Sequence, residues 1–339
     1  MNLKYKQLLY LLITSSWIGC SSPKLNQEFT GGEKIKGIIH INKGLYMPTE
    51  IKLFNEKIVL IDNDGINLIS VFDKKTLKNR RFIKKGRGPN EMLSPFYLHV
   101  NNSQLNIFDL KTQTIATCEF LSDSLTVINT SRSNNENSDY VYSFLSDRNT
   151  IVGTGNNTKG TVCINDLENN QQYTVGKYPL KEDKTVEDFV HTMACQSRIV
   201  KSPTNNKLFV AGYYQGFFQI FDKIEDKWEM IKEKHYFKSP YDRIARNGHA
   251  LYSINKNTKY AFIDLKAKGE YVYALFSGRT EHLNPEKECF GNIIIVYNWS
   301  GDIVKKYKLD KDILSFAVDN DCFYGVSYNP EPIIYKFKT

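Results

Sequence analysis

Arginine, tyrosine and histidine side chains gather in two stretches of the chain that have the composition of loops. The first stretch carries Tyr241, Arg243 and Arg246, and the second carries Arg279 and His282. Planar guanidinium groups bind carboxylates or phosphates, and a tyrosine ring offers an aromatic face to a sugar or a peptide. We therefore predict that these residues contact a ligand. Exposed arginines that only pair with neighbouring acids would give the same pattern.

A third stretch, 86–91, places an arginine, a proline and an acid among glycines. Its residues are Gly86, Arg87, Gly88, Pro89 and Glu91, with Asn90 between the last two. The glycines can adopt positive φ, the proline fixes a turn, and the carboxylate can accept backbone N–H groups. We predict a structural joint, from which Arg87 can reach a ligand. The glycine spacing is that of half a phosphate-binding loop, but no helix follows, so nucleotide binding is not expected.

Candidates for metal binding or catalysis are few. His191, Glu281 and His282 could bind a metal together, but nothing in the sequence fixes their separation. Cys195 follows His191 by four positions, a spacing that matters only on a helix with an activating partner. The hydrolase signatures Gly-x-Ser-x-Gly and His-Glu-x-x-His are missing. We predict no catalytic residue, no metal and no cofactor.

The N-terminus has the features of an export signal. Lys4 and Lys6 precede an apolar run from Leu8 to Ile18, which is too short to span a bilayer as a stable helix. The run ends on Ile18-Gly19-Cys20, which resembles the lipobox of bacterial lipoproteins, in which the cysteine becomes the acylated N-terminus. We predict that Cys20 is lipidated and holds the protein to a membrane. An ordinary signal peptide cut nearby is the alternative.

Charge and cysteine spacing exclude several classes of protein. Loss of Lys4 and Lys6 with the signal lowers the formal net charge from +8 to +6 (8 − 2), and basic residues are scattered among acids without a basic stripe. Nucleic-acid binding is therefore not expected. The five cysteines after Cys20 (6 − 1) are irregularly spaced and cannot all pair, so neither a disulfide framework nor a zinc site is predicted.

Short strands dominate the chain from residue 35 onward. β-branched or aromatic runs alternate with turn-forming residues, and amphipathic helical stretches are nearly absent. Aromatic residues make up 13% of the chain, which suits half-buried sheet surfaces. The clearest predicted strands are 57–62, 104–109, 207–211, 217–222 and 292–297. We predict an all-β protein.

The strands recur in groups of four with a period of roughly 40 to 55 residues, which is typical of β-propeller blades. The predicted units are 48–84, 95–130, 139–180, 194–237, 254–308 and 310–339. The last unit lacks one strand, and residues 36–41 form a strand without a unit of its own. We predict a six-bladed β-propeller whose last blade is closed by this N-terminal strand. A seven-bladed ring or a pair of β-sandwiches is the alternative, because blade boundaries in 131–195 are poorly marked.

Two stretches carry a family resemblance. They are Lys-Gly-Arg-Gly-Pro-Asn-Glu at 85–91 and Phe-Gly-Asn-Ile-Ile-Ile-Val-Tyr-Asn-Trp-Ser-Gly at 290–301. With the lipobox, they resemble the TolB-like six-bladed β-propeller lipoproteins common in the Bacteroides group. The resemblance implies the fold and an outer-membrane lipoprotein of the cell envelope, and it supplies no catalytic residues. Residues 21–24 lack the acidic patch that resembles a surface-export signal in this group, so periplasmic and surface-facing orientations both stay open.

One face of such a propeller carries the connections between blades and those between the second and third strands. The long insertions belong to this class: 84–94, 131–139, 181–194, 238–253 and 277–291. Length on one face is the usual mark of a binding side, so we predict the ligand contacts there. Tolerated insertion is the alternative.

These observations divide the chain into a signal peptide at 1–19, a lipidated tether at 20–34 and the propeller at 35–339. We predict a lipid-anchored binding or scaffolding module for a protein, peptide or anionic glycan rather than an enzyme. The alternative is a lactonase-like or lyase-like propeller enzyme with a divalent cation at the channel mouth. A structural envelope protein without a specific ligand is a third interpretation.

Overall fold

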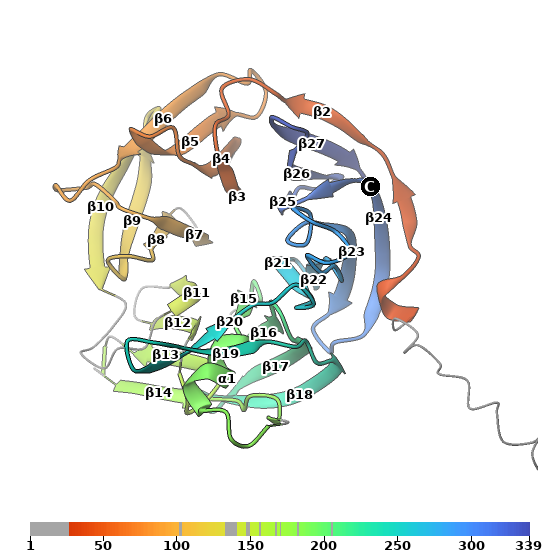
Figure 1. Ribbon diagram of the computed structural model, residues 1–339. Helices are drawn as coiled ribbons and strands as arrows, with labels where there is room; N and C mark the ends of the chain where they lie inside the picture. Colours follow the sequence, from red (N-terminus) through yellow and green to blue (C-terminus); the bar gives the residue numbers. More distant parts are fainter. Residues whose placement is uncertain are drawn as a thin grey trace, which may run out of the picture.

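The computed structural model describes residues 27–101, 104–132, 141–146, 150–155, 157–166, 168–169, 171–181, 183–204 and 206–339. The predicted signal peptide and the lipidation site Cys20 lie outside these residues. Six antiparallel sheets stand radially around a central channel (Figure 1). The predicted six-bladed β-propeller is therefore confirmed. No helix in the described part of the chain is long and apolar enough to cross a membrane.

The first three blades follow one another along the chain, each from its innermost to its outermost strand. Blade one contains β3 (Pro48–Phe54), β4 (Lys57–Asp62), β5 (Asn67–Asp73) and β6 (Asn79–Lys84). Blade two contains β7 (Pro95–Asn101), β8 (Gln104–Asp109), β9 (Thr114–Leu121) and β10 (Ser124–Arg132). Blade three contains β11 (Val141–Ser146), β12 (Thr150–Gly155), β13 (Val162–Asp166) and β14 (Gln171–Val175).

The remaining blades keep this order, with insertions around blade four. The short helix α1 (Asp188–Ala194) precedes it, and the hairpin β19 (Asp242–Arg246) and β20 (His249–Ser253) follows it. Blade four contains β15 (Ser197–Lys201), β16 (Lys207–Gly212), β17 (Gly216–Ile224) and β18 (Lys227–Phe237). Blade five contains β21 (Phe262–Lys268), β22 (Tyr271–Phe276), β23 (Gly291–Asn298) and β24 (Ile303–Ile313). Blade six contains β25 (Ser315–Val318), β26 (Cys322–Tyr328) and β27 (Pro332–Lys338).

Blade six is completed by β2 (Gly37–Ile41), which pairs antiparallel with β27. The register places Gly37 opposite Phe337 and Ile41 opposite Ile334. A Cβ atom at Gly37 would lie 2.6 Å from Phe337 Cε1, so the close packing of the two strands requires glycine there. The predicted closure by the N-terminal strand is confirmed, and the pairing covers the edge that β27 would otherwise expose.

A further N-terminal segment packs against the rim of the ring. The short strand β1 (Glu33–Ile35) runs parallel to β24 and extends blade five to five strands. Before it, the turn η1 (Gln27–Phe29) buries Phe29 in the apolar cluster shared by blades four and five. The Phe29 ring stacks on Phe276 with 4.0 Å between ring centroids. Residues of the sequence-defined tether thus take part in the packing of the propeller.

Blade boundaries follow the predicted ones closely, except in blade five. That blade begins at β21 rather than at 254, because 242–253 form the separate hairpin β19–β20. Its last strand, β24, continues to Ile313, beyond the predicted end at 308. The predicted first strand of blade six therefore begins later, at Ser315.

The core consists of apolar clusters between neighbouring blades. Residues in the middle strands are apolar on both sides, as in β4, where Ile58, Val59 and Leu60 are fully buried in succession. Such strands pack against the blade before them and the blade after them. The clusters cover each interface around the ring, including that between blades six and one. The channel is therefore the space that these radial interfaces leave at the axis.

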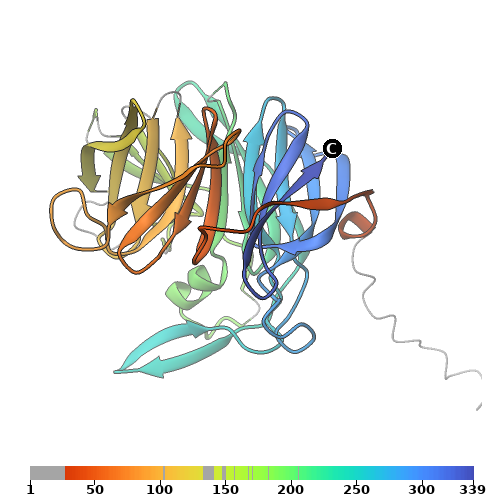
Figure 2. The same ribbon diagram turned by 90° about the horizontal axis from the view of Figure 1, so that it is seen from above.

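The two faces of the ring differ in their connections. Each complete blade has four antiparallel strands, so the chain leaves a blade on the face where it entered. We call this the loop-rich face; it carries α1 and the β19–β20 hairpin, which project from one side of the disc (Figure 2). The opposite, short-turn face carries the turns after the first and third strands of each blade. All six innermost strands run from the loop-rich face to the short-turn face.

Replacement of Phe29 by alanine tests the packing of the N-terminal segment. Loss of a buried phenylalanine removes its transfer free energy and leaves a cavity, so we expect Phe29→Ala to lower the free energy of unfolding by about 3–5 kcal/mol. Urea denaturation of the folded protein measures this change. The control is Ile38→Ala on β2, where the side chain is 62% exposed and the expected change is within about 0.5 kcal/mol. Equal effects of the two substitutions would contradict the packing role of Phe29.

Candidate functional site

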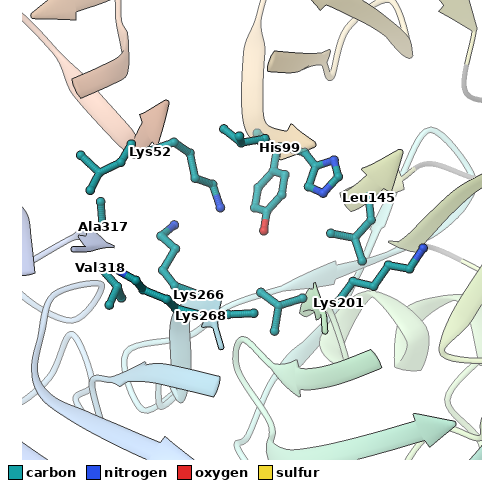
Figure 3. A pocket seen from close by; sticks show the side chains of 13 residues that line it. Lys52, His99, Leu145, Lys201, Lys266, Lys268, Ala317 and Val318 are labelled. Atoms are coloured by element: carbon teal, nitrogen blue, oxygen red, sulfur yellow. The ribbon is translucent and has the colours of Figure 1, made fainter. Parts of the chain in front are cut away.

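A cavity of about 310 Å³ lies in the central channel (Figure 3). Its walls come from the innermost strands of all six blades, namely β3, β7, β11, β15, β21 and β25. The polar residues that line it are Lys52, Tyr97, His99, Lys201, Lys266 and Lys268. None of the lining residues is acidic. This arrangement makes the cavity a basic site on the axis of the ring.

The cavity belongs to the half of the channel next to the short-turn face. Lys201 and Lys268 are the last residues of β15 and β21, and Lys52 is in the second half of β3. Because these strands all end at the short-turn face, their lysines gather there. The sequence prediction placed the ligand contacts on the loop-rich face, so this basic site was missed. The feature of the sequence that could have revealed this site is the presence of lysines in the otherwise apolar first strands of the blades.

Two buried carboxylates lie deeper in the channel and bind Lys266. The Lys266 Nζ donates to Glu50 Oε1 at 2.9 Å and to Asp264 Oδ1 at 2.7 Å. Burial disfavours the charged form of Lys266, but the attraction of Asp264 and Glu50 outweighs this effect and raises its pKa. This ion pair joins blade one to blade five.

Asp264 also joins blade five to blade six. Its Oδ2 accepts a hydrogen bond from Ser315 Oγ at 2.7 Å and from the backbone N–H of Phe316 at 3.0 Å. Burial opposes ionisation of Asp264, but Lys266, Lys52 and these hydrogen bonds together hold its pKa below the usual range. Both oxygens of Asp264 are thus used inside the protein, which leaves the carboxylate poorly suited to bind a cation.

Lys52 has a different environment from Lys266. Its Nζ lies 3.8 Å from Glu50 Oε1, beyond hydrogen-bond distance, and 5.1 Å from the centre of the Tyr97 ring. The side chain is only 15% exposed. Burial, followed by repulsion from Lys266, lowers the pKa of Lys52 to about 7, although Glu50 and Asp264 act in the opposite direction. Figure 3 shows the ammonium groups of Lys52 and Lys266 directed toward one another.

Arg198 occupies the channel on the side of the loop-rich face. Its guanidinium lies 5.5 Å from the ring centre of Phe96 and 5.1 Å from that of Tyr213, and its Nε donates to the Ile263 carbonyl at 3.2 Å. Arg198 precedes Val200, which lines the cavity, on β15. These contacts indicate that Arg198 helps to fill the channel behind the cavity rather than to line it.

On the loop-rich face, the structure brings Tyr241 and Arg243 close to α1. Arg243 forms a bidentate ion pair with Glu187, with Nη2 2.6 Å from Oε1 and Nε 2.8 Å from Oε2. Hydrogen bonding to Arg243 lowers the pKa of Glu187 to about 2. The Tyr241 hydroxyl lies 3.2 Å from His191 Nδ1. The hairpin is thus attached to α1, and Arg246 is exposed at its end.

The other predicted contact residues occupy two further loops of the same face, with Arg279 and His282 on the connection between β22 and β23. Arg279 pairs with Asp312 and donates to the Lys287 carbonyl at 3.3 Å, so its charge is used inside blade five. His282 is exposed, and its backbone N–H donates to the Lys256 carbonyl at 2.8 Å. Arg87 is exposed on the connection between blades one and two. The structure therefore does not gather the six predicted residues into one pocket.

The segment 86–91 forms a turn closed by its own glutamate. Glu91 Oε2 accepts a hydrogen bond from the Gly88 backbone N–H at 2.8 Å. A Cβ at Gly86 would lie 1.9 Å from the same oxygen, so glycine makes room for the carboxylate. Pro89 is exposed within the turn. The segment connects β6 to β7, where it holds the joint between the two blades.

His191 and Cys195 do come together on α1, with 3.8 Å between Cys195 Sγ and His191 Nε2. However, that nitrogen also lies 2.6 Å from the Pro179 carbonyl oxygen, and burial raises the pKa of the Cys195 thiol well above its usual range. A thiol of this kind is a poor nucleophile. Within the described ranges, no group of three His, Cys, Asp or Glu residues could hold a metal ion.

Two adjoining grooves lie beside the connection to blade four, one against β17 and β18 and the other against α1 and residues 238–241. They measure about 590 and 430 Å³ and share the residues Pro179, Leu180, Gln215 and Lys238. The second groove also contains His191 and Tyr241. Leu180 is 86% exposed at their common edge. The grooves provide a partly apolar surface that is separate from the basic channel cavity.

Comparison with known proteins finds one matching family. A family model described as TolB-like 6-blade propeller-like matches residues 30–321. A search of curated proteins finds no match. Among solved structures, the chain resembles a Bacteroides fragilis protein described as exported, with a TM-score of 0.53 and 10% identity over 89% of this chain and 94% of that chain. It also resembles the Myceliophteria thermophila Cps50 (Swd1) β-propeller domain, with a TM-score of 0.50 and 11% identity over 89% and 100%. These two likenesses show the fold alone.

The environment of Lys52 predicts how stability depends on pH. An unfolded lysine binds its proton near pH 10.5, whereas the folded Lys52 does so only near pH 7. Between these values the unfolded state binds more protons, so Lys52 costs stability increasingly as the pH falls from 10 to 7. We expect Lys52→Met to raise the free energy of unfolding relative to wild type, and this gain should grow as the pH falls from 10 to 7. Urea denaturation at several pH values measures it.

The matched control for this experiment is Lys75→Met, since Lys75 is an exposed lysine. Its effect on the free energy of unfolding should be small and independent of pH. A Lys52→Met variant whose stability follows that of wild type from pH 7 to 10 would contradict the lowered pKa.

Proposed function

The chain belongs to the TolB-like 6-blade propeller-like family, and we propose that it acts as a binding module of the cell envelope. In this proposal, a lipid on Cys20 anchors the protein to the outer membrane. The loop-rich face then binds a protein or peptide partner. An anionic glycan is the second ligand class, and analysis of the captured molecules distinguishes the two.

The observation that carries this proposal is the distribution of exposed apolar side chains. Eight large apolar residues that are exposed belong to the connections and insertions of the loop-rich face: Tyr46, Met47, Ile66, Leu180, Phe189, Ile244, Ile254 and Leu283. The short-turn face has Leu77, Leu121, Ile224 and Tyr271. The larger share of exposed apolar side chains on the loop-rich face supports a protein-binding surface on that side.

The charged groups of the loop-rich face support a partner with acidic groups. Arg87 and Arg246 are exposed, whereas Arg243 and Arg279 are paired with acids of the protein itself. Arginines at the rim of an apolar surface increase the rate and the specificity of association more than the affinity. We therefore infer that Arg246 helps to select the partner, and that Arg243 and Arg279 fix the loops.

The charges in the channel favour binding over metal-assisted catalysis. A divalent cation at the channel mouth would face Lys52, Lys201 and Lys268, and both deeper carboxylates are already bound to Lys266. Repulsion from the lysines opposes cation binding at this position. The lactonase-like or lyase-like alternative thus has no observation in its favour.

Lipidation is tested by replacing the acylated residue. We expect wild-type protein expressed with its signal peptide to incorporate labelled palmitate and to sediment with membranes, because acyl chains anchor a protein by burying their methylene groups. Cys20→Ser should lose both the label and the sedimentation. Cys163→Ser, at a partly exposed cysteine within blade three, is the control and should keep both. Equal labelling of the Cys20→Ser variant and the wild-type protein would contradict the proposed anchor.

The binding face is tested with matched charge substitutions on the two faces. Leu180→Asp with Leu283→Asp alters two residues of the loop-rich face that are 86% and 73% exposed. Leu121→Asp with Ile224→Asp alters two exposed residues of the short-turn face. We expect the first pair to reduce the partners captured from solubilised envelopes at least about tenfold, because buried interface positions tolerate no unpaired charge. The second pair should leave capture unchanged.

Quantitative mass spectrometry of captured proteins and glycans provides the measurement. Loss of the same partners with the short-turn variant, or with neither variant, would contradict the choice of face. Arg243→Ala with Arg246→Ala tests the hairpin separately, and unchanged capture by this variant would remove the hairpin from the interface.

A further inference from the structure

We propose that the basic cavity in the channel binds a small anion, a carboxylate-bearing or phosphate-bearing compound of about monosaccharide size. The anionic group lies between Lys52 and Lys266. This site opens on the short-turn face, whereas the proposed function uses the loop-rich face. The two proposals therefore stand on different residues, and each can fail without the other.

The channel carries an excess of positive charge. In its described part, Lys52, Arg198, Lys266 and Lys268 stand against the two carboxylates of Glu50 and Asp264. Near the mouth, Asp319 is paired with Lys74 at 3.1 Å, and Lys268 donates to the neutral Asn320 Oδ1 at 2.9 Å. A concave, low-dielectric wall with such an excess concentrates anions.

Two amine groups face one another in the cavity. Lys266 has three N–H donors, of which two go to Glu50 and Asp264, and the third is within reach of the Lys52 amine. Lys52 is directed toward Lys266 across the cavity (Figure 3). An anionic oxygen placed between them accepts a charge-assisted hydrogen bond from each and replaces their repulsion by attraction. An anionic group between Lys52 and Lys266 therefore complements the charge of both side chains.

The cavity has the size of a small-molecule site. Its volume of about 310 Å³ is at the lower end of the range of small-molecule sites, which is roughly 300–1,000 Å³. A compound of monosaccharide size fits, whereas a folded domain does not. Lysine ammonium groups bind carboxylate and phosphate alike as point charges. The lining residues thus select a ligand by its charge and size and accept either kind of anion.

Anion binding at this place is linked to the protonation of Lys52. In the free protein its pKa is about 7, so above this pH the lysine is largely neutral. A bound anion favours the charged form, and binding above pH 7 therefore takes up a proton. The affinity must fall as the pH rises above 7 and level off below it. The groups that face Lys52 and bear on this titration are Glu50, Tyr97, His99, Asp264 and Lys266.

Most of these neighbours keep one charge state between pH 7 and 8.5. Lys266 has a raised pKa and Asp264 a lowered one, so both stay charged in this interval. Burial raises the pKa of Tyr97 to about 12, so its hydroxyl stays neutral. This interval therefore reports chiefly on Lys52.

The experiment is calorimetric titration of the folded protein with three probes that share one sugar ring. D-galacturonate carries a carboxylate, D-galactose 6-phosphate carries a phosphate, and D-galactose carries no charge. We expect at least one anionic probe to bind at least about tenfold more tightly than D-galactose. The stronger of the two identifies the anion class. Equal binding of all three probes, or binding of none, would overturn the proposal.

The pH dependence uses D-galacturonate, because its carboxylate does not titrate between pH 7 and 8.5. Its affinity should fall roughly tenfold over this interval, and the binding heat should depend on the ionisation enthalpy of the buffer, since a proton is taken up. An affinity that is constant over the interval would overturn the role of Lys52.

Variants of Lys52 complete the test. Lys52→Met should weaken binding of the anionic probe at least tenfold while the protein stays folded, as checked by circular dichroism. Lys52→Arg keeps a charge that does not titrate in this interval and should bind with an affinity independent of pH. Lys75→Met is the control and should bind as wild type. Unchanged binding by Lys52→Met would overturn the site.

Discussion

The ring of blades closes where β2, from the N-terminal part of the chain, completes the sheet of β25, β26 and β27. Closure of the ring brings the first and last blades into contact at the axis. Only a closed ring brings Glu50 of blade one, Lys266 of blade five and Ser315 of blade six to a common point. The ion pair and hydrogen bonds among them in turn connect the innermost strands of three blades. Closure at the rim and charge pairing at the axis therefore stabilise the same arrangement from two sides.

The two faces of the propeller expose different kinds of residues. The loop-rich face holds α1, the β19–β20 hairpin and most of the long connections, and its exposed residues include eight large apolar side chains together with lysines, arginines and acids. The short-turn face has short connections and opens onto the lysines of the channel. Arg198, with its aromatic neighbours Phe96 and Tyr213, lies between the two regions. Because the regions share no lining residue, a large partner on one face does not compete for contacts with a small anion on the other.

The strand pattern of the sequence was sufficient to predict the blades, because a strand that is buried on both sides has a sequence of consecutive apolar residues between turn-forming residues. Thus β4 and β8 begin and end where predicted. The helix α1 was missed because it has only seven residues and is held by tertiary contacts. The axial charge cluster was missed for another reason: Glu50 and Lys266 are 216 positions apart and meet only after closure. A lysine within a strand does not tell which other charges will face it.

The position of Phe29 has a consequence for how the molecule sits on a bilayer. Phe29 fixes η1 at the rim, beside β18 and β24, and Lys306 donates to the carbonyl oxygens of Gln27 and Thr30 there. Six residues separate Cys20 from Gln27, which limits the reach of the lipid attachment to about 25 Å. With the anchor proposed at Cys20, this part of the rim stays within about 25 Å of the lipid attachment, so the short linker holds the propeller close to the bilayer while the channel axis is free to turn.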